Sequence, residues 1–332
     1  MSRGRNLITD VAGIRVGNAH DVGLASGVTV ALFEEPAVAS VSTLGGAPAN
    51  RDTACLEPDA TVEAVDAIVL SGGSGFGLDA AGGVQAWLRE RGRGFPIGPV
   101  TVPIVPQAIV FDLLNGGDKA WGRYPPYREL AWDACERAGP DFALGTAGGG
   151  YGATTADLKG GLGSASARTS RGHGVGALVI VNAIGSAIVG GGPHFWAAPW
   201  EVGDEFGGLG LPADAAERGR RLVWKGGPQP ATTIALVATD AVLTKGQAHR
   251  IAVQANDGLA RALRITHAPY DGDTVFCAAT GRAPLGDDPA AALTEIGAVA
   301  ADVLARAVAR GVYEATGLGF PGQPPGWRER FG

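Results

Sequence analysis

Residues 226–240 read GGPQPATTIALVATD, a glycine- and proline-rich loop that runs through Ala231 into an apolar strand opened by two threonines. A threonine hydroxyl is a weak nucleophile at neutral pH and needs an adjacent base to activate it. If the chain is cut in front of Thr232, the freed α-amine of that residue supplies the base, with an unperturbed pKa of roughly 8. Paired threonines at a strand start also follow from β-propensity alone. The stretch therefore predicts a strand and leaves two interpretations of Thr232 open, nucleophile or ordinary strand residue.

The strand expected at 275–280 is preceded by two aspartates, Asp271 and Asp273. Side chains alternate along an extended chain, so both carboxylates point to the same side, and Gly272 leaves the other side open. Carboxylates this close repel each other, so one of them holds its proton near neutral pH. That property suits an acid, base or orienting role beside a nucleophile. An Asp-Gly turn or a calcium-like cluster is the alternative interpretation.

Residues 71–77 read SGGSGFG and connect an apolar run at 67–70 to a predicted helix. The loop lacks the complete GxGxxG pattern and the Lys-Ser/Thr pair of a P-loop, which argues against binding of a nucleotide phosphate. The backbone N–H groups of Gly75, Phe76 and Gly77 at a helix start can instead form part of an oxyanion hole. A non-catalytic protein that binds a small anionic metabolite through this loop is the alternative from a different functional class.

The composition indicates a globular protein and narrows the range of its partners. The 332 residues carry a formal net charge of −6, which argues against nucleic acid or an anionic membrane surface as a partner. The sequence holds no run of about 18 uncharged apolar residues, and its first residues hold no apolar run of signal-peptide length. We therefore expect a cytoplasmic protein with no membrane segment. The 54 glycines lack a collagen period and indicate tight turns and close backbone approaches.

The cysteines and histidines do not form a recognisable metal or catalytic pattern. Cys55, Cys135 and Cys277 are far apart and show no CxxC spacing, so neither a disulfide framework nor a zinc site is predicted. The five histidines show no HxxxH or HExxH spacing, and no GxSxG elbow is present. His267 is of interest because it stands near the aspartate pair. We expect no metal and no cofactor.

Apolar periodicity predicts strands and helices that do not strictly alternate. Strands are expected at 28–33, 39–44, 67–70, 104–114, 177–189, 232–240 and 275–280, and helices at 78–91, 127–137, 245–263 and 289–315. Thr244 is the expected N-cap of the third helix. The segment 200–230, called the arm below, is expected to be partly solvated, and the tail 317–332 is expected to be extended or mobile. The whole pattern predicts an α+β fold in a single domain, 1–332, with sheets covered by helices.

In their order along the chain, these motifs resemble the DmpA/NylC family of self-cleaving hydrolases. That family includes L-aminopeptidase/D-esterases, β-aminopeptidases and nylon-oligomer endohydrolases, and the resemblance covers nearly the whole chain. It is carried by NLITDVAGIRVG at 6–17, SGGSGFGL at 71–78, Lys159, VIVN at 179–182, TTIALVATD at 232–240, LTK at 243–245 and DGDTVF at 271–276. None of these motifs is decisive alone, whereas the ordered set is specific.

The resemblance implies a four-layer α/β/β/α sandwich of the N-terminal-nucleophile (Ntn) hydrolase type. It implies a precursor that cuts itself between Ala231 and Thr232, after which residues 1–231 and 232–332 remain associated as an α- and a β-subunit. Such α/β heterodimers are expected to assemble into a homotetramer or a larger oligomer. The implied substrate is a small peptide or amide of the β-, D- or ω-amino acyl type. It is hydrolysed through a threonine acyl-enzyme, and an acyltransferase that uses the same nucleophile stays an open alternative.

The resemblance also implies roles for single residues. Thr232 is the nucleophile, and Asp271 and Asp273 orient its amine and shuttle protons. The amide of Asn182 is expected to donate to the oxyanion together with the glycine-loop N–H groups, although a buried strand asparagine is ordinarily a hydrogen-bonded core residue. The ammonium of Lys159 is expected near the nucleophile, where its charge lowers the pKa of the α-amine. A lysine in a surface turn is the alternative.

Two positions depart from the family pattern. Ala231 stands where several relatives have asparagine or glycine. A small residue still permits an N→O acyl shift, but we expect a slower self-cleavage. Phe111, expected to line the substrate pocket, stands where the nylon-oligomer hydrolases carry a tyrosine. The missing hydroxyl argues against a nylon-type substrate preference.

Overall fold

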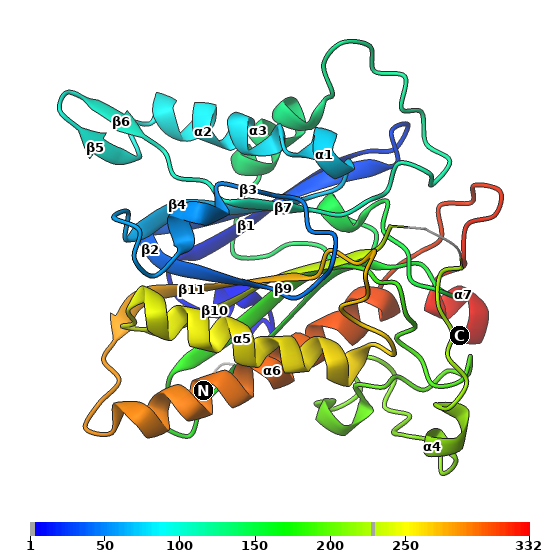
Figure 1. Ribbon diagram of the computed structural model, residues 1–332. Helices are drawn as coiled ribbons and strands as arrows, with labels where there is room; N and C mark the ends of the chain where they lie inside the picture. Colours follow the sequence, from blue (N-terminus) through cyan, green and yellow to red (C-terminus); the bar gives the residue numbers. More distant parts are fainter. Residues whose placement is uncertain (1–3, 227–229) are drawn as a thin grey trace.

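The computed structural model describes residues 4–226 and 230–332 and contains one large mixed sheet with helices on both sides (Figure 1). Its strands are β1 (Ile14–Asp21), β2 (Ser26–Thr43), β3 (Asn50–Arg51), β4 (Ala64–Ser71), β7 (Gln107–Ile109), β8 (Gly161–Arg168), β9 (Gly174–Asn182), β10 (Thr232–Ala241) and β11 (Thr274–Ala283). The strand order is β3-β7-β4-β2-β11-β10-β9-β8, and β1 pairs with β2 off this path. A separate hairpin consists of β5 (Phe95–Ile97) and β6 (Val100–Val102).

The described helices lie on the two outer sides of the sheet and at one end of it. They are α1 (Ser74–Gly77), α2 (Ala80–Glu90), α3 (Tyr127–Glu136), α4 (Ala215–Arg218), α5 (Lys245–Ala262), α6 (Pro289–Tyr313) and α7 (Trp327–Phe331). Short 3-10 helices are η1 (Ile8–Asp10), η2 (Thr53–Leu56), η3 (Gly148–Gly150) and η4 (Ala198–Trp200).

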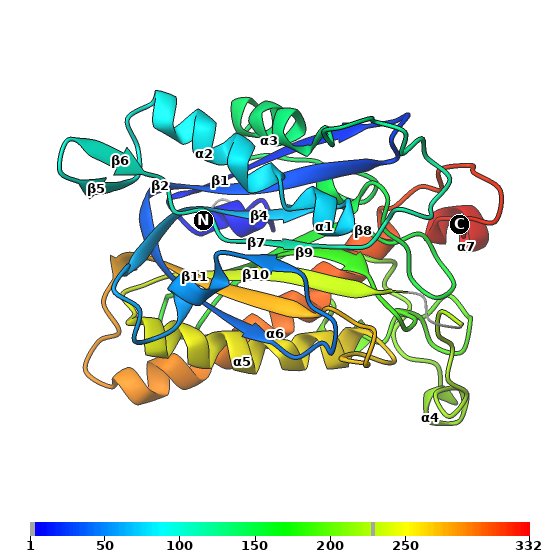
Figure 2. The same cartoon turned by 45° about the horizontal axis from the view of Figure 1, so that its top comes forward.

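The buried apolar residues form three clusters, which correspond to the three interfaces between four layers. One cluster lies between helices α2 and α3 and the part of the sheet made by β1, β4 and the first half of β2. The middle cluster lies between the two halves of the sheet and includes Phe33, Leu70, Ile180 and Phe276. The third lies between strands β8 to β11 and helices α5 and α6. The layers are therefore helix, sheet, sheet and helix, as Figures 1 and 2 show and as the resemblance implies.

Strand β2 connects the two halves of the sheet. Its first half pairs with β1 and β4, whereas residues 38–43 pair with β11. The sequence predicts two strands separated at 34–36, but the chain stays extended through this stretch, with a register irregularity against β4 between Leu32 and Ala37. Pro36 falls within the irregularity, where the missing N–H of a proline is tolerated.

Strand β10 brings the predicted site residues to one end of the sheet. It runs antiparallel to β9, so Thr232 at its start is paired with Asn182 at the end of β9. It runs parallel to β11, so the two strands begin at the same edge of the sheet. The segment that leads into β11 carries Asp271 and Asp273 and therefore lies beside the start of β10.

The four long helices are found within a few residues of their predicted bounds, as α2, α3, α5 and α6. Thr244 caps α5 as predicted. Its side chain accepts the Gln247 N–H, and the Gln247 side chain accepts the Thr244 N–H in return. This capping box satisfies two N–H groups that lack a partner within the helix.

Three further predicted segments differ from the structure. The strand expected at 104–114 is confined to β7, which begins only after Pro106, a residue without an N–H for a ladder. The strand expected to reach residue 189 ends at Asn182, because its partner β10 begins directly opposite. The tail expected to be extended contains α7, whose Trp327 is buried among the rings of Phe195 and Tyr313. No helix in the described part of the chain is long and apolar enough to cross a membrane.

Candidate active site

The carbonyl oxygen of Ala231 accepts hydrogen bonds from two directions. The Gly272 N–H donates to it at 3.0 Å, and the Thr232 hydroxyl donates to it from the next residue. The Ala231 N–H donates to Tyr270 O at 3.1 Å, and Ala231 forms a parallel bridge with Asp271. Ala231 and Thr232 are both buried. The peptide bond between them is therefore held on the Asp271–Gly272 segment, with the threonine hydroxyl against its carbonyl.

Gly272 passes so close to Thr232 that no side chain fits between them. A Cβ at position 272 would lie 2.8 Å from Thr232 Oγ and 3.1 Å from the backbone oxygen of Ala47. The missing side chain lets the backbone approach the threonine and place its N–H on the Ala231 carbonyl. This close approach therefore requires a glycine between the two aspartates.

Asp273 holds the first residues of β10 in place. One carboxylate oxygen accepts the Thr233 N–H at 2.8 Å. The other accepts the His267 N–H at 2.9 Å and lies 2.9 Å from His267 Nδ1. The side chain is buried, and hydrogen bonds to a charged acceptor are stronger than neutral ones. Asp273 therefore fixes the backbone that carries the Thr232 hydroxyl.

Asp271 differs from its neighbour because one of its oxygens has no partner. The side chain is buried, and Oδ1 forms no hydrogen bond within the described residues. Burial raises the pKa of the Asp271 carboxyl to about 8, and the nearby Asp273 carboxylate adds to the rise. Both effects favour the protonated form of this carboxyl.

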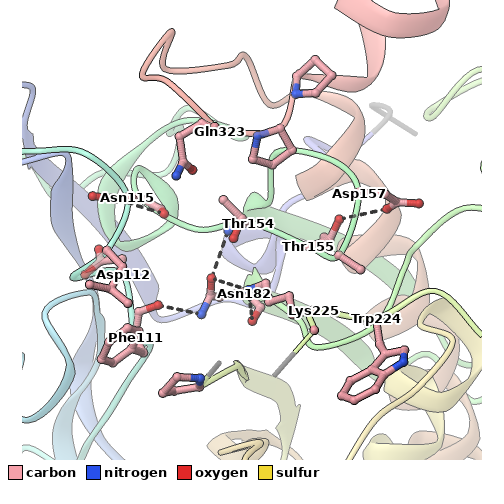
Figure 3. A pocket seen from close by; sticks show the side chains of 18 of the residues that line it. Phe111, Asp112, Asn115, Thr154, Thr155, Asp157, Asn182, Trp224, Lys225 and Gln323 are labelled. Carbon is pink, nitrogen blue, oxygen red and sulfur yellow. Dashed lines mark hydrogen bonds between the residues drawn. The ribbon is translucent and has the colours of Figure 1, made fainter. Parts of the chain in front are cut away.

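Asn182 is the buried last residue of β9, and contacts from three segments fix its amide (Figure 3). Its Oδ1 accepts the Thr154 N–H at 3.0 Å and the Lys225 Nζ at 3.2 Å, while its Nδ2 donates to Phe111 O at 3.0 Å. Because a backbone N–H can only donate, the Thr154 contact sets which end of the amide is oxygen. One hydrogen of Nδ2 remains for a further acceptor.

Lys159 is fully buried behind the turn that carries Thr154. Its Nζ donates to three backbone oxygens, Gly150 O at 3.1 Å, Ala153 O at 2.7 Å and Gly160 O at 2.9 Å. Burial lowers the pKa of its amine to about 7. Thr154 and Lys159 form an antiparallel bridge, so the lysine braces the turn whose N–H holds Asn182. The described hydrogen bonds of its Nζ do not extend to the nucleophile, and its influence on the α-amine stays a prediction.

A cavity of about 720 Å³ opens beside Asn182. Its wall comes from the segment after β7, the turn at 152–157, the arm and the tail. The lining residues are Phe111, Asp112, Leu114, Asn115, Gly152, Thr154, Thr155, Ala156, Asp157, Asn182, Trp224, Lys225, Gly226, Pro230, Pro321, Gly322, Gln323, Pro324 and Pro325. Phe111 is among the residues that line this cavity, and Figure 3 shows the polar side chains grouped around Asn182.

A family model described as peptidase family S58 matches residues 6–323. The chain belongs to this peptidase family. An uncharacterized aminopeptidase of Mycobacterium tuberculosis (strain ATCC 25618 / H37Rv) is 43% identical over 333 residues, which cover 93% of this S58 chain and 94% of that protein. The 6-aminohexanoate-oligomer endohydrolase of Kocuria sp. (strain KY2) is 26% identical over 335 residues, covering 92% and 86% of the two chains.

The fold is shared with a solved structure, that of the L-aminopeptidase D-Ala-esterase/amidase from Ochrobactrum anthropi. The TM-score is 0.72 at 20% identity, over 98% of this chain and 92% of that one. That protein is described as a prototype for the serine aminopeptidases and as a variant of the Ntn hydrolase fold. The predicted fold class is confirmed. Family membership makes this S58 protein an enzyme of the aminopeptidase and amidase class, which hydrolyses C–N bonds.

The glycine loop of this S58 chain does not line the cavity. The N–H groups of Phe76 and Gly77 donate to Gly73 O at 3.1 and 3.2 Å, so they are not free to bind an oxyanion. The Phe76 ring is exposed and packs edge-on against Trp121. A Cβ at Gly75 would meet no atom within 4 Å, so this residue faces open space. These contacts give no support to the predicted oxyanion role of the loop.

Two residues that touch Asn182 escaped the sequence prediction. Thr154 contributes only a backbone N–H from a turn, for which the sequence holds no signal. Lys225 carries a weak signal, because it is the single lysine between residues 200 and 231 and stands shortly before Thr232. Burial lowers the pKa of its amine to about 7, while the Asp271 carboxyl opposes that shift.

Proposed function

We propose that this S58 enzyme is a self-processing N-terminal-nucleophile amidohydrolase. The observation that carries the proposal is the Ala231 carbonyl, whose oxygen accepts the Gly272 N–H while the Thr232 hydroxyl lies against it. A fixed donor on a carbonyl oxygen stabilises the negative charge that develops when a hydroxyl attacks the carbonyl carbon. The bond between Ala231 and Thr232 is accordingly the one we propose to be cut.

In the self-cleavage step, Thr232 Oγ attacks the carbonyl carbon of Ala231 and gives its proton to a base. Collapse of the tetrahedral intermediate breaks the C–N bond and leaves the acyl group on Oγ as an ester, and the α-nitrogen takes up a proton. Water then hydrolyses the ester. The products are residues 1–231, ending in a carboxylate, and residues 232–332, beginning with a free α-amine.

In turnover, the α-amine of Thr232 takes the proton of its own Oγ as that oxygen attacks a substrate amide. The free Nδ2 hydrogen of Asn182 binds the oxyanion, the leaving amine departs with a proton, and water releases the acyl group. Asp273 keeps the start of β10 oriented, and Asp271 exchanges a proton with the amine. The positive charge of Lys159 behind Thr154 favours the neutral form of that amine.

The proposed substrates are small peptides or amides of the β-, D- or ω-amino acyl type. A cavity of about 720 Å³ is of a size that encloses a small ligand, and Gln323, whose Oε1 has no hydrogen-bond partner among the described residues, offers a neutral group in its wall. The two relatives named above, an aminopeptidase and an oligoamide hydrolase, support this substrate class. We further propose that the processed heterodimers form a homotetramer, as the family resemblance implies.

The reactivity class of the enzyme tests this proposal. Acylation of amino groups should abolish hydrolysis of an amino acyl p-nitroanilide, because an acylated α-amine is no longer a base, and peptide mass spectrometry should find the acyl group on the α-amine of Thr232. Iodoacetamide and EDTA should leave the rate unchanged, because the proposed mechanism uses neither a thiol nor a metal. Loss of activity with either of those two reagents would show that a different chemistry operates.

A further inference from the structure

Lys225 fastens the arm to the end of β9 through its side chain and its backbone. Its Nζ donates to Asn182 Oδ1 at 3.2 Å and to Asn182 O at 3.3 Å, and its N–H donates to Ile184 O at 2.9 Å. The preceding residue, Trp224, forms an antiparallel bridge with Gly185. The arm therefore runs along the chain that directly follows β9, and it is anchored there at Lys225.

The nucleophile is anchored to the same strand end, because Thr232 is the register partner of Asn182. Asn182 thus contacts residues on both sides of the proposed cleavage site. Lys225 lies on the acyl side, and Thr232 lies on the amine side. These two anchors keep Lys225 and Thr232 close to one residue and restrict how far the two can move apart. Such restriction raises the rate of a reaction between groups that are held near each other.

We propose that Lys225 is a positioning residue for self-cleavage, which ties the acyl side of the scissile bond to Asn182. The inference rests on the proposed cut between Ala231 and Thr232. The contact does not depend on the charge of the lysine, because a neutral amine also donates an N–H. The charge of Asp271, when ionised, raises the pKa of the Lys225 amine, and the charge of Lys225 lowers the pKa of the Lys159 amine.

The role is largely confined to the precursor. After the cut, Lys225 and Thr232 belong to different chains, so the lysine no longer limits the position of the nucleophile. The orientation of the Asn182 amide is still set by the Thr154 N–H, which the cut does not touch. Loss of Lys225 should therefore slow self-cleavage by a larger factor than it slows turnover by the processed enzyme.

The experiment compares these two rates in the full chain. Newly synthesised wild-type, Lys225→Met and Lys225→Arg chains are followed by intact mass for the appearance of the 232–332 fragment. Arg221→Met, which removes an exposed cation of the same arm, is the matched control. Turnover of an alanyl or 6-aminohexanoyl p-nitroanilide is then measured per mole of 232–332 fragment. We expect Lys225→Met to slow fragment appearance by about 10-fold or more, since it removes two side-chain hydrogen bonds.

Turnover per processed site should fall by a clearly smaller factor in Lys225→Met, and Lys225→Arg should recover most of the processing rate. Wild-type processing in Lys225→Met, or equal losses in processing and turnover, would overturn the inference. A wild-type chain that stays whole would contradict the proposed function instead. Thermal unfolding in the Thr232→Ala background, which cannot cut itself, controls for the fold. If Lys225→Met is unstable there, Lys225→Gln replaces it in the comparison with Lys225→Arg.

Discussion

Thr232, Gly272 and Asp271 surround one buried peptide bond, and each contributes a different group. Thr232 presents a hydroxyl and Gly272 a backbone N–H to the Ala231 carbonyl. Asp271 adds a buried carboxyl whose pKa is raised to about 8, first by burial and then by the Asp273 carboxylate. The carboxylate oxygens of Asp273 instead accept hydrogen bonds from backbone N–H groups of neighbouring segments. The two aspartates are therefore expected to act in different ways, one on protons and the other on geometry.

Substitution of either aspartate should reduce turnover with the fold largely kept. Asp271→Asn removes a group that exchanges a proton, and Asp273→Asn removes the charge that holds Thr233 and His267. Each change should lower turnover of an amino acyl p-nitroanilide by roughly 10²-fold or more. Asp287→Asn, at an exposed position, is the control and should turn over normally. Near-normal rates in both site variants would contradict the proposed roles.

The raised pKa of Asp271 also predicts how stability depends on pH. The unfolded chain releases this proton near its ordinary pKa of roughly 4, whereas the folded chain keeps it to about pH 8. The group therefore favours the folded state below its unfolded pKa, and this contribution is lost as the pH rises toward 8. In the Thr232→Ala background, Asp271→Asn should make the urea midpoint less dependent on pH between about 5 and 8. An unchanged pH dependence would show that Asp271 is not protonated in the folded chain.

At the scale of elements, the site forms around the start of β10. The end of β9 and the segment before β11 both lie beside the first residue of β10. Apolar runs were enough to predict that β4, β9, β10 and β11 exist, since these strands are buried, although β9 ends earlier than predicted, at Asn182. The continuity of β2 through 34–36 and the helix α7 in the tail depend on distant partners, so local sequence does not reveal them.

The same distinction separates the predicted from the unpredicted site residues. Thr232, Asn182 and the aspartate pair lie in or next to strands that the sequence predicts, and the family resemblance singled them out. Lys225 reaches Asn182 only because the arm folds back on the end of β9, a non-local contact without a sequence pattern. The contacts of the glycine loop do not support the oxyanion role predicted for it, because the N–H groups of Phe76 and Gly77 are used within its own short helix.

The close approach of the segment before β11 can be tested at its glycine. Gly272→Ala should strongly slow self-cleavage, because the new Cβ would lie 2.8 Å from Thr232 Oγ and push the N–H away from the Ala231 carbonyl. Gly75→Ala is the matched control, since a Cβ there meets nothing within 4 Å, and its processing should stay within about twofold of wild type. The measurement is the time course of fragment appearance. Equal processing of the two variants would contradict the proposed role of the Gly272 N–H.

At the scale of the whole molecule, a cut at the start of β10 does not divide the protein into two compact parts. The fragment 232–332 supplies β10 and β11, which lie between β2 and β9 of the fragment 1–231. Helices α5 and α6 of the same fragment cover strands that both fragments contribute. Neither fragment has a complete sheet or core alone. The processed protein should therefore stay associated under native conditions and separate only when it is denatured.

The mass of the purified protein under denaturing conditions tests the central claim most directly, with Thr232→Ala measured in parallel. The account predicts two masses in the wild type, with the smaller one beginning at Thr232, and their sum equal to the full chain plus one water. Thr232→Ala should give one full-length mass. A wild-type protein that remains a single chain would contradict the account. So would a fragment that begins at Thr233, because strand alternation places that side chain on the opposite face of the sheet.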